Sequence, residues 1–231
     1  MCSNFEPVVF TERLQATFGV SLEGDTLPSE AWPMSIAPVI FLAEDGRGKR
    51  ICQPGLFGLL PHFATELSFG RKTYNARSET VASKPSFRQV WAEGQRCIIP
   101  AERIFESNWE TGKAVRWAIQ DPRASAMAIA GLYSRWRTPD GRAQLTFAML
   151  TVTADGHPVM QRFHKPGDEK RMVVILDEAQ INDWCACPVS DAQKFLTPKM
   201  SQLHAYAAPL PPRIKKAAHR ALPVPQNGEL F

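Results

Sequence analysis

Several features that would assign this chain to a membrane or secreted class are missing from its 231 residues. No apolar run approaches the roughly 20 residues that a membrane-spanning helix needs, so we expect no contact with a membrane. The first seven residues contain the acidic Glu6 and no basic residue. A secretory signal peptide starts with a positively charged region, so we expect none here. The expected location is the cytoplasm, in association with the nucleoid.

Cysteine is also scarce, and its pattern excludes two common uses. The five cysteines are odd in number and irregular in spacing, whereas disulfide frameworks use even numbers in secreted chains. In a reducing compartment they would stay thiols. Cys185 and Cys187 are one residue apart with no second pair, unlike the spacing of a structural zinc site. We therefore predict no metal, and nothing in the sequence points to a cofactor.

The charge is modest, with 27 basic and 23 acidic side chains and a formal net charge of +4. This balance is compatible with a polyanionic partner but does not require one. The hydrophobic fraction of 44% is typical of a globular protein. The length suffices for one large domain or two small ones.

Short apolar or alternating segments dominate the chain and predict strands. The expected strands cover residues 39–43, 55–61, 97–100, 103–106, 115–119, 126–133, 145–153 and 172–176. Helices are expected over residues 10–18 and 85–95 and after Asp177. Because the strands do not alternate strictly with helices, a doubly wound parallel sheet is not expected. We predict an α+β fold, a single domain with a curved, mostly antiparallel, barrel-like sheet and peripheral helices.

Cys2 carries the strongest chemical signal. If Met1 is removed, which a small second residue permits, the chain begins with a cysteine. Its α-amine, with a pKa of about 7.7–8.0, and its thiol, with a pKa of about 8.5, both have reactive fractions near neutral pH. Such a pair can attack a carbonyl with nitrogen and then close a five-membered ring with sulfur. The alternative is an accidental cysteine in a frayed terminus.

Four further motifs carry polar groups suited to chemistry or to nucleic acid. They are Gly58-Leu59-Leu60-Pro61-His62-Phe63, Asn75-Ala76-Arg77-Ser78-Glu79-Thr80, Phe105-Glu106 after Cys97-Ile98-Ile99-Pro100-Ala101, and Phe163-His164. Singly, each has a simple structural explanation: Asn75 would cap a turn, Glu106 would pair with a surface lysine, and His164 would be a satisfied loop histidine. Together with Cys2 and in this order, they resemble the SRAP family of SOS response-associated peptidase-domain proteins over residues 2–205.

The resemblance implies a function and a set of reactive residues. SRAP proteins form covalent crosslinks to abasic sites in single-stranded DNA, so this chain would be an abasic-site sensor that forms a thiazolidine at Cys2. It would act as a monomer. Asn75 would hold the amine and a nearby phosphate, Glu106 would shuttle protons at the amine and at the departing hydroxyl, and His164 would promote opening of the sugar.

The resemblance also implies which residues contact DNA. Arg77 would bind phosphate, with Lys84 and Arg88 on the following segment. Phe63 and Phe57 would stack on a flanking base, a contact worth about 1–3 kcal/mol per base. Thr151 belongs to the same family pattern and would lie along the DNA path.

The chain departs from the family pattern mainly at these DNA contacts. The family continues Cys-Gly-Arg at the terminus, whereas Ser3 and Asn4 follow Cys2, so a phosphate-binding arginine is missing. Phe57 and the pair His62-Phe63 stand where the family has tryptophans, and Ser107 replaces the tryptophan expected after the glutamate. The family's compact His-x-Arg-Met-Pro is stretched to residues 164–172.

Two other functions are open from the residues themselves. Cys2, His164 and Asn75 would also suit a thiol hydrolase or N-terminal-nucleophile peptidase that removes Met1 itself, and a lyase-like activity at abasic sites is a related possibility. A non-catalytic single-stranded DNA-binding module with Met1 retained is the second. Mixing the protein with an abasic oligonucleotide and measuring its mass separates the three.

The amino-acid composition of the C-terminal segment differs from that of the rest of the chain. No internal repeat or clean linker precedes residue 205, and five prolines then alternate with basic residues. We predict a folded domain over residues 1–205 and a Pro-rich basic tail over residues 206–231. The final six residues, 226–231, faintly resemble a sliding-clamp-binding peptide, although an ordinary frayed terminus explains them more simply.

Overall fold

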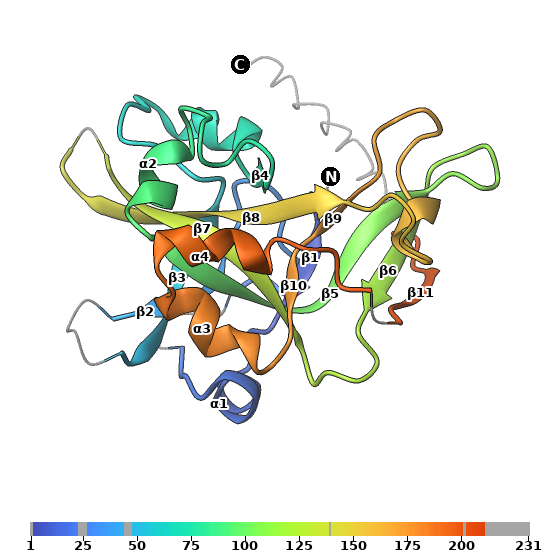
Figure 1. Cartoon of the computed structure of the whole chain (residues 1–231), viewed down its shortest axis with the longest axis horizontal. Coiled ribbons are helices and arrows are strands. Elements are labelled where there is room, and N and C mark those ends of the chain that lie inside the picture. Colours follow the sequence, from blue (N-terminus) through green and yellow to red (C-terminus); the bar gives the residue numbers. More distant parts are fainter. Residues whose placement is uncertain (1, 23–26, 44–47, 139, 201, 211–231) are drawn as a thin grey trace, which may run out of the picture.

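The computed structural model describes residues 2–22, 27–43, 48–138, 140–200 and 202–210. Within these residues, eleven strands belong to one sheet, and short helices surround it (Figure 1). The strands are β1 (Phe5–Pro7), β2 (Ile36–Leu42), β3 (Arg50–Phe57), β4 (Asn75–Arg77), β5 (Arg96–Asn108), β6 (Val115–Gln120), β7 (Met127–Arg137), β8 (Ala143–Thr153), β9 (Arg171–Val173), β10 (Ile175–Leu176) and β11 (His204–Ala207). The α-helices are α1 (Thr11–Phe18), α2 (Arg88–Ala92), α3 (Gln180–Ala186) and α4 (Val189–Ala192), and the 3-10 helices are η1 (Leu67–Lys72), η2 (Met160–Arg162) and η3 (Gln193–Phe195).

Five of the strands close into a barrel. The long strand β5 pairs with β2 on one side and with β7 on the other. From β2 the ring continues through β3 and β8 and returns to β7. All of these pairs are antiparallel except β3 with β8. Closure removes free strand edges from the ring. The predicted α+β fold with a curved, mostly antiparallel, barrel-like sheet is therefore confirmed.

The barrel core is filled by apolar side chains that pack closely against one another and against the backbone. Phe57 of β3 stacks on Phe147 of β8 with ring centroids 5.2 Å apart. At Gly131 of β7, a Cβ atom would lie 2.7 Å from the carbonyl oxygen of Ala148. Any larger side chain there would push β7 from β8, so glycine is required at this position.

The helices cover the outside of the barrel (Figure 1). In α3, Trp184 is fully buried, and its indole N–H donates to the carbonyl oxygen of Cys97 in β5 over 2.9 Å. This bond satisfies the polar end of a large side chain at the helix–sheet contact. None of the helices among the described residues is long and apolar enough to cross a membrane.

Most predicted elements are present, with shifted limits. The two strands expected at 97–100 and 103–106 are one continuous strand, β5, and the helix expected at 85–95 shortens to α2. The predicted domain boundary at residue 205 falls inside β11, which pairs with β6. The division into domain and tail stays a prediction, because residues 211–231, including the clamp-like hexapeptide, lie outside the described residues.

Two segments pair with the second half of β5, and β4, which pairs with β8, brings Asn75 to Cys2. The strand β1 pairs with β5 through Phe5 and Ile104, which places the N-terminal residues beside it. A bridge between Asn108 and Phe163 ties the segment after η2 to the end of β5. The short strand β4 runs parallel to β8, with Asn75 opposite Met149. Cys2, Asn75, Glu106 and His164 are thereby brought to one region from four distant parts of the sequence.

Candidate functional site

Cys2 lies in an anchored segment rather than in a frayed terminus. The backbone N–H of Phe105 donates to the carbonyl oxygen of Asn4 over 2.9 Å, and Phe5 exchanges two backbone hydrogen bonds with Ala31. The Cys2 side chain is buried, and its Sγ lies 3.5 Å from the carbonyl oxygen of Asn4. Cys2 is therefore not in a frayed terminus, and its chemical role stays a prediction.

Asn75 reaches Cys2 directly. Its Nδ2 donates to the carbonyl oxygen of Cys2 over 2.7 Å, although 73 residues separate the two in sequence. Its Oδ1 is buried and has no hydrogen-bond partner. A buried acceptor left unpaired costs about 1–3 kcal/mol. Such an atom beside the terminal residue is available to accept a hydrogen bond from an amine or a substrate.

Glu106 and His164 form a close buried pair next to Cys2. The Nε2 atom of His164 lies 3.4 Å from Oε2 of Glu106, without hydrogen-bond geometry, and both imidazole nitrogens are unpartnered. Oε1 of Glu106 is also buried without a partner. The two groups therefore leave three polar atoms free to bind a reacting molecule.

The backbone holds His164 in an unusual conformation. Its φ is +66°, in the left-handed region that costs about 1–2 kcal/mol for a residue with a Cβ. Its N–H donates to the carbonyl oxygen of Ser107 over 3.0 Å, and its own carbonyl accepts from Lys170 Nζ over 3.1 Å. Strained residues held by their surroundings in this way cluster at functional sites.

Burial shifts the pKa values of Glu106, His164 and Cys2 strongly. It raises the pKa of Glu106 to about 7 and lowers the pKa of His164 to about 4. Burial, with the neighbouring charge of Glu106, raises the pKa of the Cys2 thiol to about 12. At neutral pH the imidazole is therefore neutral, and the carboxyl is close to half protonated. A carboxyl that can both donate and accept a proton near pH 7 suits acid–base chemistry.

A cleft opens beside this pair. It has a volume of about 510 Å³, and its lining includes Ser3, Glu106, Trp109, Arg116 and His164. This volume falls within the range of small-molecule sites. A larger cavity of about 880 Å³, lined by residues of α1, β3 and β8, contains none of the predicted catalytic residues. We take the smaller cleft as the candidate site, because its lining includes Glu106, His164 and the two residues that follow Cys2.

The family has an arginine at position 4, where this chain has Asn4, and the side chain of Arg116 lies directly beside Asn4. Nε and Nη2 of Arg116 both donate to Oδ1 of the buried Asn4, over 3.1 and 2.9 Å. The guanidinium also pairs with Glu30 and lies 3.4 Å from the ring centroid of Phe105. A guanidinium group thus lies beside residue 4, although it belongs to Arg116 of β6 and not to residue 4 itself. The alternation of Arg116 with apolar neighbours in a strand was the available signal.

Among the predicted DNA-contact residues, four lie at the surface. Phe63 is 44% exposed, Lys84 and Arg88 are exposed on the segment that follows β4, and Arg77 is about half exposed. No contact in the structure tests what they bind. Their roles stay predictions.

Two predicted DNA contacts are wrong. Phe57 is completely buried and packs against Phe5, Tyr74 and Phe147, so its ring cannot reach a base. Thr151 is 1% exposed. Its hydroxyl lies 3.5 Å from the carbonyl oxygen of Ala76 and 3.3 Å from the guanidinium of Arg171. It supports that arginine rather than touching DNA.

Two further residues near the site were not anticipated. Burial, together with the charges of Cys2 and Glu106, raises the pKa of the Tyr74 phenol, which places that ring in the same electrostatic environment. Arg171, at the start of β9, is almost fully buried. Its position beside Met172 in the stretched family motif was the only sequence signal for it.

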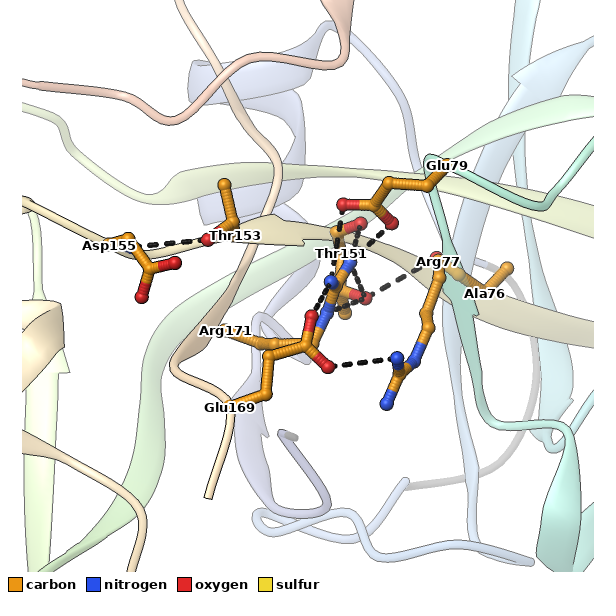
Figure 2. A network of polar contacts seen from close by, with 8 residues as sticks. All are labelled: Ala76, Arg77, Glu79, Thr151, Thr153, Asp155, Glu169 and Arg171. Atoms are coloured by element: carbon orange, nitrogen blue, oxygen red, sulfur yellow. Dashed lines mark hydrogen bonds and ion pairs between the residues drawn. The ribbon is translucent and has the colours of Figure 1, made fainter. Parts of the chain in front are cut away.

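Arg171 is the centre of a polar network (Figure 2). Its guanidinium donates to both carboxylate oxygens of Glu79, over 3.2 and 2.9 Å, and to the carbonyl oxygen of Thr151. It also donates to Glu169 over 2.6 Å, and Glu169 in turn pairs with Arg77 over 2.8 Å. A buried charge is tolerated only when it is paired in this way.

Comparison with known proteins identifies relatives along most of the chain. The model of the family described as SOS response associated peptidase (SRAP) matches residues 1–215. The abasic site processing protein YoqW of Bacillus subtilis is 31% identical over 166 residues, covering 70% of this chain and 68% of YoqW. The abasic site processing protein HMCES of Xenopus tropicalis is 24% identical over 195 residues, covering 72% of this chain and 56% of HMCES.

A solved structure agrees with the same relationship. The crystal structure of a protein from Bordetella bronchiseptica is 34% identical and superimposes with a TM-score of 0.84, covering 90% of this chain and all of the other. A Bacteroides thetaiotaomicron protein, at 21% identity and a TM-score of 0.77, shares the fold. The family resemblance read from the motifs is confirmed.

Proposed function

Because this chain belongs to the SRAP family, described as SOS response associated peptidase, we propose that it senses abasic sites in single-stranded DNA and crosslinks to them. The crosslink is a thiazolidine at Cys2, formed once Met1 is removed. The proposal is supported by the contact of Asn75 Nδ2 with the Cys2 carbonyl oxygen, beside the buried Glu106–His164 pair. The names of the relatives, abasic site processing proteins, point the same way.

The reaction balances with the loss of one water and needs no oxidant. The open form of an abasic sugar carries an aldehyde at C1′. The Cys2 amine adds to this carbon, a C–N bond forms, and the oxygen takes up a proton. The hydroxyl then leaves as water to give an imine. Sulfur adds to the same carbon, the thiol proton moves to a base and the imine nitrogen gains a proton, which closes the five-membered ring.

Glu106 is suited to both proton transfers. With a pKa of about 7, its protonated form can donate to the departing hydroxyl, and the resulting carboxylate can accept the thiol proton. The second role matters because the thiol pKa is about 12. At pH 7 only about 10⁻⁵ of such a thiol is ionised. Sulfur therefore needs a base at the moment it attacks, and Oε1 of Glu106 has no other partner.

His164 and Asn75 act on the two reactants. The neutral imidazole of His164, with its unpartnered nitrogens, can accept the sugar hydroxyl proton and return it to the ring oxygen as the sugar opens. Asn75 fixes the Cys2 carbonyl and offers Oδ1 to the amine. The amine is thereby directed toward the incoming aldehyde, which favours attack in a fixed geometry.

The DNA strand is held mainly through its phosphates. Abasic sites occur in any sequence, so contacts to phosphate rather than to bases are expected. Arg77, Lys84 and Arg88 supply the cations, and the exposed ring of Phe63 is available to stack on a flanking base. Binding should weaken steeply as salt is added.

The deciding experiment is intact-mass analysis after mixing the protein with single-stranded DNA that contains one abasic site. We expect a mass increase equal to the DNA minus one water, on a chain whose N-terminal sequencing begins at Cys2. Cys2→Ala should give no adduct while still binding the strand. An adduct of the same yield in Cys2→Ala overturns the chemistry, and peptide turnover without an adduct favours a hydrolase.

A further inference from the structure

The loop between His164 and Arg171 is longer than the family pattern and is internally tied. Six residues separate these two positions. The N–H of Asp168 donates to the carbonyl oxygen of Lys165 over 3.1 Å. Lys170 Nζ donates back to the carbonyl oxygens of His164 and Lys165. The loop is therefore a compact unit that begins at the reaction site and ends with Glu169 and Lys170 before β9.

Glu169 joins this loop to Arg77. One carboxylate oxygen, Oε2, lies 2.8 Å from Nη1 of Arg77, and the other, Oε1, lies 2.6 Å from Nη1 of Arg171 (Figure 2). The pair with Arg77 is the only ion pair of that arginine among the described residues, and both side chains are close to half exposed. The guanidiniums hold the pKa of Glu169 below its usual value, so the carboxylate is charged at neutral pH.

Arg77 stands where a phosphate of the bound strand is expected. It is two residues from Asn75 on β4, and side chains two apart on a strand point to the same face, about 6–7 Å apart. Asn75 contacts Cys2, so we expect Arg77 to lie about one nucleotide from the carbon that reacts with Cys2. A carboxylate and a phosphate bind a guanidinium by the same charge-assisted hydrogen bonds.

We propose that, in the free protein, the Glu169 carboxylate binds the Arg77 guanidinium at the position where a DNA phosphate would bind. A DNA phosphate must then displace this carboxylate, so Glu169 sets the affinity and the salt dependence of strand binding. The inference rests on the proposed function for the identity of the ligand. It assigns to the stretched loop, which carries His164 at its other end, a role in substrate binding.

The network is arranged so that displacement leaves no buried charge unpaired. When Glu169 leaves Arg77, the buried Arg171 keeps both oxygens of Glu79 and the carbonyl oxygen of Thr151 as partners. The exposed pair itself contributes little to folding, as is usual for surface ion pairs. Its main effect is therefore on what Arg77 can bind.

The test is equilibrium binding of a single-stranded oligonucleotide that carries tetrahydrofuran in place of the abasic sugar. This analogue has no aldehyde, so the measurement is independent of crosslinking and decides the role of Glu169 even if the proposed chemistry fails. Glu169→Gln should bind about two- to fivefold more tightly near 0.1 M salt. Its plot of log affinity against log salt should steepen by about 0.7, the value for one additional phosphate on a single strand.

Two further variants control for net charge and for the route of the effect. Asp140→Asn removes the same charge from an exposed pair with Arg142, also 2.8 Å long, in the β7–β8 turn, and should bind about as the unaltered protein does. In an Arg77→Gln background, Glu169→Gln should change neither affinity nor slope. Equal gains in Glu169→Gln and Asp140→Asn, or a gain that persists without Arg77, overturn the proposal. Thermal melts establish that each variant is folded.

Discussion

Oε2 of Glu106 lies 3.4 Å from Nε2 of His164, and the pKa of the glutamate is higher than that of the histidine. A glutamate usually loses its proton well before a histidine does, but burial raises the pKa of Glu106 to about 7 and lowers that of His164 to about 4. Between these values, the proton resides on the carboxyl and the imidazole is neutral. The pair is therefore a carboxylic acid beside a neutral base between about pH 4 and pH 7, and the carboxyl is close to half protonated at neutral pH.

This reversal predicts a bell-shaped pH dependence for crosslinking. The rate should rise as the Cys2 amine loses its proton, with a pKa of about 7.7–8.0. It should fall as Glu106, with a pKa of about 7, loses the proton that it donates. The maximum should lie between about pH 7 and 8 in single-turnover measurements from pH 5 to 9. Glu106→Gln should react about 10²–10⁴-fold more slowly and lose the falling limb. A wild-type rate in this variant would make Glu106 purely structural.

The raised pKa of Glu106 also predicts a stabilising substitution. A carboxyl whose pKa is higher in the folded chain contributes stability in full below its unfolded value of 4.5, and this contribution is lost as the pH rises to about 7. Glu106→Gln removes the cost of burying the charge, so it should increase the free energy of unfolding by about 3 kcal/mol at pH 8 relative to the unaltered protein. Near pH 4.5 the difference should be small. Urea unfolding at the two pH values measures it.

The control for that experiment is Glu110→Gln. Glu110 is an exposed carboxylate whose pKa is lowered by its hydrogen bonds with Arg162, so its removal should not stabilise the fold at pH 8. An equal gain in both variants would mean that net charge, rather than the burial of Glu106, is responsible. A gain in stability on removing a functional group is a common trade-off, so this result would agree with the proposed role of Glu106.

Asn75→Ala tests whether Cys2 needs a side chain to hold it. The substitution removes the 2.7 Å hydrogen bond to the Cys2 carbonyl and the free Oδ1. We expect crosslinking to slow by about tenfold or more, which corresponds to the loss of one well-placed hydrogen bond. Binding of the tetrahydrofuran oligonucleotide should change little. An unchanged crosslinking rate would show that β1 alone positions the aminothiol.

The sequence predicted the barrel and the grouping of the candidate site residues for different reasons. Alternating and apolar segments such as residues 145–153 mark strands on their own, because the two faces of a strand meet different surroundings. The meeting of Cys2, Asn75, Glu106 and His164 rests on long-range pairings that no local pattern reveals. It could be expected only from the order of the motifs and their family resemblance.

The errors arose where local patterns do not identify the buried face. Phe57 lies inside the apolar run Gly55-Leu56-Phe57-Gly58-Leu59-Leu60, which carries no polar neighbour to mark an exposed side. Thr151 is buried because β4 and β9 both pair with β8 at that point. The burial of Arg171 was equally hidden, since a charged side chain is rarely buried and its partner Glu79 lies 92 residues away in the chain.

The Asn4–Arg116 pair yields the final prediction, on the departure at position 4. Asn4 is buried and accepts two hydrogen bonds from Arg116. In Asn4→Arg, the family residue would place a second guanidinium beside the first and remove the acceptor. We expect the free energy of unfolding to fall by about 1–3 kcal/mol. Adding Arg116→Ala should recover part of this loss, because the substitutions act on one contact and are not additive. If urea unfolding of the two single variants and the double variant shows simple additivity, Asn4 and Arg116 contribute independently to the stability of the fold.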